Sequence, residues 1–239
     1  MRRYLPNTIV PTNELLGSVA EQLKLPLMNI ARRAELAQLS GHIDPSELSV
    51  IYNHAVAALN LVDSYMLGLE LLREQKTLEL EPVSISSVLT DTAHALDSFA
   101  KQYGVVIELE VAGKYRPVMG HSAGLKAALL SLGYELIEVQ ASHTKSARLT
   151  LAASRNAHGI VAGVYSDYED LQADHWRRAL ELCGKARQPF TTLTAGSGAG
   201  VFVADAILQA MDTRLGVGRY HKQRGLATVL QPSQQLQFV

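Results

Sequence analysis

The sequence has almost no cysteine, no excess of charge of one sign and no long apolar run, and each absence excludes a class of protein. Its single cysteine, Cys183, can neither form an internal disulfide nor share a zinc ion with a second cysteine. We therefore expect a reducing compartment, the cytoplasm. The 22 Lys and Arg residues balance 23 Asp and Glu residues, so we expect neither nucleic acid nor an anionic membrane surface as the main partner.

No run of about 18 apolar residues is present to cross a bilayer, and the first residues lack the apolar core of a signal peptide. Membrane insertion and secretion are therefore not expected. What the chain does have is 47% hydrophobic residues over 239 positions, which is enough for one large or two small domains.

Two stretches near the N-terminus carry small or apolar residues at the 4-3 spacing of a heptad seam. The first covers about residues 12 to 39 and contains Pro26, which should kink it. The second begins at Asp44, the expected N-cap, with Pro45 in the first turn. The seam residues are Leu16, Ala20, Leu23, Leu27, Ile30, Ala34 and Ala37, then Leu48, Tyr52, Ala55, Leu59, Val62, Met66 and Leu69.

The short link between these stretches predicts an antiparallel helical hairpin. A lone hairpin cannot cover its own apolar stripe, whereas two hairpins together make a four-helix bundle. We therefore expect a homodimer that forms through roughly residues 12–75.

From residue 77 onward the pattern becomes mixed. Strands are predicted at 77–81, 105–111, 147–153, 160–165, 214–220 and 226–231, and helices at 87–103, 122–139, 174–187 and 201–211. This order predicts an α+β sandwich in which helices cover one face of a single sheet. We place the domain boundary between a hairpin domain, 1–76, and a second domain, 77–239.

A glycine-rich stretch, QPFTTLTAGSGAGV at residues 188–201, precedes the last predicted helix. It is similar to the Pro-Phe-Phe-Thr-Thr segment that leads into the second glycine box of one subfamily of bacterial sensor histidine kinases. In that setting Gly196, Gly198 and Gly200 would let the backbone approach phosphates, and the next helix would offer its first amides. By composition alone, a flexible turn is the alternative interpretation.

The order of elements resembles the same family over about residues 12–232. The resemblance implies a dimerisation and phosphoacceptor hairpin, followed by an ATP-binding α/β sandwich of the GHKL type. The chain departs from the family at its functional positions, however.

The first departure lies where the family has the motif His-Glu-Leu-Arg-Thr-Pro-Leu. The aligned stretch here is Glu21-Gln22-Leu23-Lys24-Leu25-Pro26-Leu27. Glu21 stands in place of the phosphoacceptor histidine, and a carboxylate cannot form the phosphoramidate that an imidazole forms. Glu21 is then either a solvated helix charge or a permanent mimic of phosphate that a partner recognises. The resemblance gives these candidate partner-binding residues: Glu21, Gln22, Lys24 and Pro26.

The histidines of the chain offer no obvious replacement for that acceptor. None of them pairs with another at the spacing of a helical metal site, so no metal site is predicted. We expect them to be surface or capping residues. His54 lies within the second predicted helix and is the alternative phosphoacceptor.

The second departure lies in the residues that align with the nucleotide site. Ser131 and Glu135 stand where the family has Asn residues, one of which holds Mg²⁺. Glu135 is then either a surface charge or a ligand for a hard cation. Asp167 could replace the Asp that reads adenine, but both glycines of the first glycine box are missing and acidic residues follow. The vestigial nucleotide-binding set is Ser131, Glu135, Asp167, Gly196, Gly198 and Gly200. We expect no cofactor; weak binding of ATP with Mg²⁺ is the alternative.

Three functions fit these observations. The first, which an intact scaffold with a replaced acceptor favours, is a non-catalytic regulator that binds a response-regulator receiver domain or a histidine kinase. The second is a divergent phosphotransferase or ATPase with an unorthodox acceptor. The third is a module that binds another ligand in the altered pocket.

Overall fold

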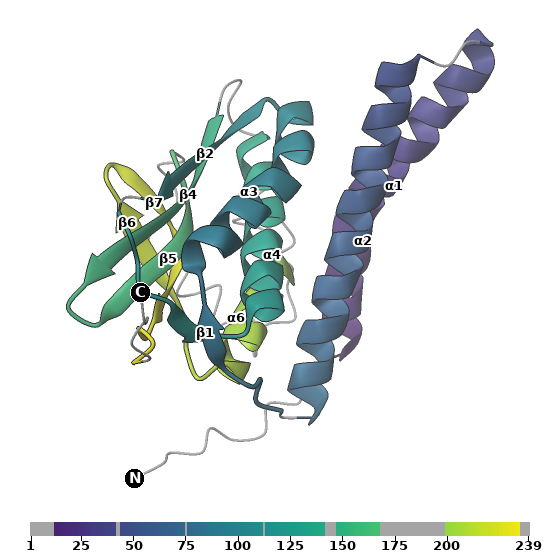
Figure 1. Ribbon diagram of the computed structural model, residues 1–239. Coiled ribbons are helices and arrows are strands. Elements are labelled where there is room, and N and C mark those ends of the chain that lie inside the picture. Colours follow the sequence, from purple (N-terminus) through teal and green to yellow (C-terminus); the bar gives the residue numbers. More distant parts are fainter. Residues whose placement is uncertain are drawn as a thin grey trace.

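The computed structural model describes residues 12–41, 44–74, 76–111, 113–141, 147–167 and 199–234. It consists of a long helical hairpin set against an α/β unit (Figure 1). In chain order the elements are α1 (Thr12–Ser40), α2 (Pro45–Glu74), β1 (Glu81–Val83), α3 (Ile85–Gln102), β2 (Val105–Val111), β3 (Val118–Gly120), α4 (Ser122–Ala141), β4 (Ala147–Asn156), β5 (Gly159–Ser166), α6 (Ala199–Ala210), β6 (Leu215–Tyr220) and β7 (Gln223–Leu230).

The predicted antiparallel hairpin is confirmed, and its second helix begins at the predicted cap. The backbone carbonyl of Asp44 accepts from the amides of Glu47 and Leu48. Its side-chain Oδ1 accepts from the amide of Ser46 at 2.9 Å, so Asp44 satisfies donors that the first turn leaves open. Helix α1 continues without interruption through Pro26, which is buried.

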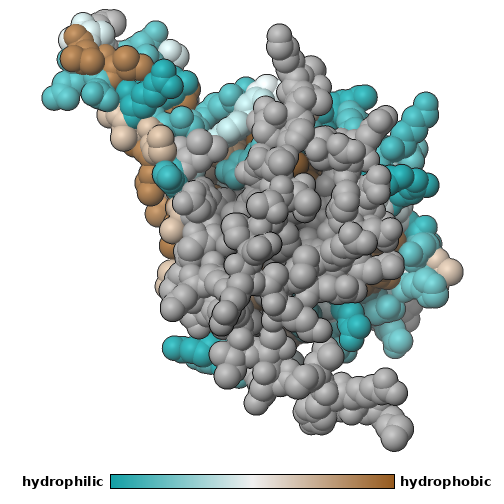
Figure 2. All heavy atoms as spheres, turned by 180° about the vertical axis from the view of Figure 1, so that it is seen from behind, coloured by the Kyte–Doolittle hydropathy of each residue, from teal (hydrophilic) through white to brown (hydrophobic). Residues whose placement is uncertain are grey.

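Helix α2 has two apolar faces with different surroundings. One face is buried against the α/β unit and carries Ala57, Leu61 and Tyr65. The other carries four large seam residues that are each more than half exposed, which we call the exposed stripe: Leu48, Tyr52, Leu59 and Met66. Apolar residues on the projecting part of the hairpin are visible as brown atoms (Figure 2). The described residues of the single chain therefore leave these four seam side chains largely uncovered.

The α/β unit contains a five-stranded sheet with the order β2-β4-β5-β7-β6. Strands β2 and β4 are parallel and all other neighbours are antiparallel. Alternate side chains such as Leu149, Leu151 and Val164 are buried on one face of the sheet. Helices α3, α4 and α6, the helical layer, cover that face, as predicted, and α2 lies along the outer side of this layer (Figure 1).

The strand predicted at 77–81 is wrong. Leu78 and Leu80 do pack on the core while Thr77 and Glu79 are exposed, which explains the alternation. Among the described residues, however, no strand pairs with this stretch, and the amide of Leu78 instead donates to the carbonyl of Ala210 at 2.8 Å. The strand begins later, at β1, which pairs with β3. The helix predicted at 174–187 lies outside the described residues.

Candidate functional site

Helix α4 is the centre of the candidate nucleotide site, and it is buried on all sides. Every residue from 128 to 140 is buried, since the sheet lies on one side of the helix and α2, α3 and α6 on the others. Such a helix needs no polar face. The side chain of Glu135 is 0% exposed, so its interpretation as a surface charge is wrong.

The first turn of α6 meets α4 at Glu135. The amide of Gly200 donates to Glu135 Oε2 at 3.3 Å. A Cβ atom on Gly200 would come within 2.5 Å of the carbonyl oxygen of Ser131, so only glycine permits this approach. The structure therefore brings together Ser131, Glu135 and Gly200 of the predicted set. Gly196 and Gly198 lie outside the described residues.

The contact between Glu135 and the N-terminus of α6 is electrostatically favourable for a negative charge. The first amides of a helix have no partner within the helix, and with the helix dipole they favour an anion. Here the carboxylate of Glu135, from the same chain, lies against the first turn of α6.

Asp167 is placed apart from this group. It follows β5 and is exposed, with Oδ2 accepting from Arg148 Nε at 3.1 Å and Oδ1 from Gln223 Nε2 at 3.0 Å. The alternation along β5 puts Val164 on the helix-covered face, and hence Asp167 on the opposite face. The structure therefore does not bring Asp167 together with Ser131 and Glu135.

Ser166 was not among the predicted site residues, although its position on the sheet is better than that of Asp167. It ends β5 on the helix-covered face and is 1% exposed. The two-residue period of the strand is the signal that would have selected Ser166 over Asp167.

The predicted partner-binding residues lie on α1 but differ in exposure. Glu21 and Gln22 belong to the helix, while their side chains are outside the described part of the structure. Lys24 is exposed, whereas Pro26 is buried and Leu23 packs against the main core. One side of this segment therefore faces the α/β unit and another faces solvent.

His54 is not a surface residue, so that expectation is wrong for this histidine. It is 2% exposed, and its ring meets Phe99 of α3 edge-on, with centroids 6.1 Å apart. Burial lowers the pKa of His54, and the positive charge of Arg33 adds to this effect. A buried, neutral imidazole cannot reach a phosphate donor in solution. His121 is a capping residue as expected, because its Nδ1 accepts from the amide of Gly124 at 3.0 Å.

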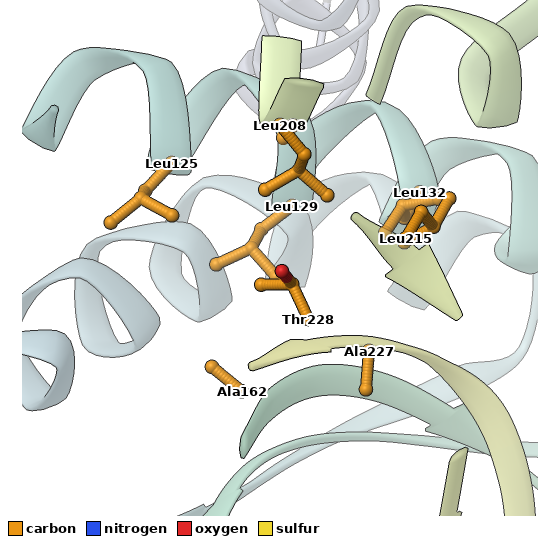
Figure 3. Close-up of a pocket in the computed structure, with 9 residues that line it drawn as sticks. Leu125, Leu129, Leu132, Ala162, Leu208, Leu215, Ala227 and Thr228 are labelled. Atoms are coloured by element: carbon orange, nitrogen blue, oxygen red, sulfur yellow. The ribbon is translucent and has the colours of Figure 1, made fainter. Parts of the chain in front are cut away.

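A small apolar cavity lies between α4, α6 and the sheet. Leucine side chains from the helices point toward Ala162, Ala227 and Thr228 on the strands (Figure 3). Its volume is only about 10 Å³, roughly the space for one water molecule. The hydroxyl of Thr228 already bonds with that of Thr213 at 2.8 Å, so this cavity is a packing gap.

Within the described ranges, no group of three or more His, Cys, Asp or Glu side chains is arranged to hold a metal ion. Among the helices that the structure describes, none is both long and apolar enough to cross a membrane.

Comparison with solved structures identifies the fold of this chain, whereas the sequence comparisons find no relative. No protein-family model matches the sequence, and no curated protein matches it. Among solved structures, the Acinetobacter baumannii histidine kinase AdeS aligns over 89% of this chain and 98% of its own, with a TM-score of 0.50 and 16% identity. The chain has a histidine kinase core fold.

Two further solved structures share the fold of this chain. Full-length ShkA in complex with AMPPNP aligns over 94% of this chain and 47% of its own, with a TM-score of 0.52 and 18% identity. A bacterial phosphotransferase aligns over 95% of this chain and 98% of its own, with a TM-score of 0.51 and 11% identity. At these identities the similarity to the histidine kinase core concerns the fold, and it confirms the predicted α+β fold class, with a helical hairpin followed by a kinase-type α/β sandwich.

Proposed function

We propose that this chain is a non-catalytic, histidine-kinase-like signalling regulator of the cytoplasm. It acts as a homodimer and binds a response-regulator receiver domain or a histidine kinase by protein contact. It does not bind nucleotide tightly and does not phosphorylate itself on the usual histidine.

The observation that carries this proposal is the position of the Glu135 carboxylate. It is fully buried, and it accepts a hydrogen bond from the amide of Gly200 at the start of α6. A nucleotide phosphate at this helix terminus would need to displace the carboxylate or accept a like charge beside it. In a buried setting such repulsion is screened far less than in water.

The acceptor chemistry supports the same function. Glu21 aligns with the acceptor position of the family that the sequence resembles, and a carboxylate would form an acyl phosphate instead of a phosphoramidate. The alternative acceptor, His54, is buried beside Phe99. Neither residue offers the exposed imidazole that autophosphorylation needs.

The homodimer is supported by the exposed stripe on α2. Its four residues Leu48, Tyr52, Leu59 and Met66 follow the heptad seam and are each more than half exposed. Leu27 of the α1 seam is also more than half exposed. Apolar side chains gathered along one seam mark an interaction surface, and a second hairpin would cover this one in a four-helix bundle.

Calorimetric titration with ATP, with and without Mg²⁺, tests the absence of nucleotide binding. We expect no heat of binding up to about 1 mM ATP, where the binding free energy would be only about −4 kcal/mol. Micromolar binding would contradict the proposal.

A matched titration of the Glu135→Gln variant identifies which feature of the site prevents ATP binding. This variant keeps an acceptor for the Gly200 amide and removes the charge. Regained binding would attribute the exclusion of ATP to the carboxylate. Continued absence would attribute it to the loss of the first glycine box.

Partner binding is tested at Lys24, which is exposed on α1 beside the acceptor position. We expect immobilised receiver domains or histidine kinases to include a partner whose affinity for Lys24→Glu falls at least about tenfold, the effect of losing about 1.4 kcal/mol. Arg32→Glu reverses an exposed charge on the same helix, two turns away, and should leave the affinity unchanged. Equal losses in both variants, or no binding partner for the unmodified chain, would refute this mode of action.

The second candidate is a phosphotransferase with an unorthodox acceptor. It is favoured by the glycine-rich stretch 196–200 and by the similarity in fold to a bacterial phosphotransferase. Incubation with a radiolabelled phosphorylated receiver separates the two candidates, since only a phosphotransferase would take up label.

A further inference from the structure

The contact between α2 and the helical layer includes buried polar groups as well as apolar ones. Gly68 of α2 lies so close to α6 that an added Cβ would be 3.0 Å from Val203 Cγ1. Asn60 of α2 donates to the hydroxyl of Tyr134 of α4 at 3.2 Å. Near these contacts, the hydroxyl of Tyr65 and Oε1 of Glu138 are buried and have no hydrogen-bond partner among the described residues. Such groups are rare in folded proteins and call for an explanation.

Glu138 is the most costly of these groups if it is ionised. It is 8% exposed. Its surroundings bring together Tyr65 of α2, Tyr103 at the end of α3 and Glu135 one turn earlier on α4. From α1, Asn29 contacts Tyr103 and the charge of Arg33 acts on His54. Among the described residues, the charge that acts on Glu138 is therefore the carboxylate of Glu135, which has the same sign.

A carboxyl group in this setting keeps its proton. Burial, and then repulsion from Glu135, raise the pKa of Glu138 to about 8. If α2 moved away, Tyr65 would no longer cover Glu138, and water could solvate the carboxyl group. The pKa would then return toward its ordinary value of 4.5. Proton binding is thereby coupled to the packing of the hairpin.

We propose that the contact between the hairpin and the helical layer is a proton-linked latch, closed while Glu138 is protonated and opened when Glu138 loses its proton. Opening exposes the buried face of α2, with Ala57 and Leu61, and the surfaces of α4 and α6 that it covers. The latch thus controls access to the junction of Glu135 and Gly200. This control operates whether or not a nucleotide or a protein partner binds there.

The direction of the pH effect follows from the two pKa values. Below pH 4.5 Glu138 is protonated in both arrangements, so the closed form has its full stability. Between 4.5 and about 8 only the open form releases the proton, and the closing equilibrium constant falls about tenfold per pH unit. Above pH 8 both forms are ionised and no further change is expected.

Energy transfer between two dyes measures opening directly. In a Cys183→Ser background, Ser49→Cys near the start of α2 and Lys114→Cys on the α/β unit are both exposed sites for labels. Labelled chains are mixed with excess unlabelled chain, so that transfer occurs within one molecule. We expect transfer to fall between pH 5.5 and 9 in the otherwise unmodified chain.

Substitution of Glu138 tests whether ionisation of its carboxyl group causes the opening. Glu138→Gln cannot ionise and should stay closed up to pH 9, while Glu35→Gln, at an exposed position on α1, should open like the unmodified chain. If Gln prevents folding, as judged by circular dichroism, Glu138→Met provides a second neutral side chain of similar length. Constant transfer in the unmodified chain up to pH 9 would overturn the proposal. So would equal opening in the chain with a neutral residue at 138.

Discussion

At the scale of single residues, the close approach of two helices fixes the identity of Gly200 in the candidate site. Gly200 lies where α6 crosses α4, and any side chain there would strike the backbone at Ser131. Glycine at this position is therefore required for packing, whatever its relation to phosphates. The hydrogen bond from its amide to Glu135 depends on the same approach.

Gly200→Ala should destabilise the chain by about 1–3 kcal/mol, the usual cost of forcing an extra methyl group into a close-packed contact. The added Cβ would lie 2.5 Å from the Ser131 oxygen, which cannot move without distorting α4. Urea unfolding measures the loss. Gly216→Ala is the matched control, because its Cβ would meet only the carbonyl oxygen of Ala227 at 3.9 Å. A loss of equal size in both variants would contradict the packing argument.

At the scale of elements, local sequence patterns predicted which helices and strands form, but they did not predict which elements pack against them. The heptad seams and the cap at Asp44 predicted α1 and α2, and the alternation of apolar residues predicted most strands, because both signals are properties of one segment. The seam on α2 accounts for only one of its two faces. The other face, with Ala57, Leu61 and Tyr65, meets α4 and α6, and no periodicity within α2 identifies that partner.

The errors at the candidate site have the same origin. His54 and Glu135 are polar residues on helices, which favours a surface position, yet tertiary packing buries both of them. The alignment with the family points to Asp167 as a replacement for the adenine-binding Asp, although the strand period places Ser166, not Asp167, on the helix-covered face. The contact of Glu135 with Gly200 joins residues 65 positions apart and could be inferred only through the family resemblance.

At the scale of the whole molecule, the hairpin has one interface within the chain, and the proposed homodimer gives it a second one toward another copy. They lie on different faces of α2, so the latch at Glu138 can open without separating the exposed stripe from its partner. The two equilibria are then independent. A change in the exposed stripe should alter assembly and leave the contact with the helical layer intact.

Leu59→Lys should convert the dimer to a monomer. Leu59 lies in the middle of the exposed stripe and is 63% exposed in the single chain, so the change costs the isolated chain little, but it would bury two unpaired ammonium groups at a two-fold interface. Sedimentation velocity measures the outcome, and we expect a loss of affinity of at least about a hundredfold. Glu35→Lys, which places the same side chain at an exposed position off the seam, should remain a dimer. If Leu59→Lys also stays dimeric, subunits associate through another surface, and the exposed stripe is available to a different partner.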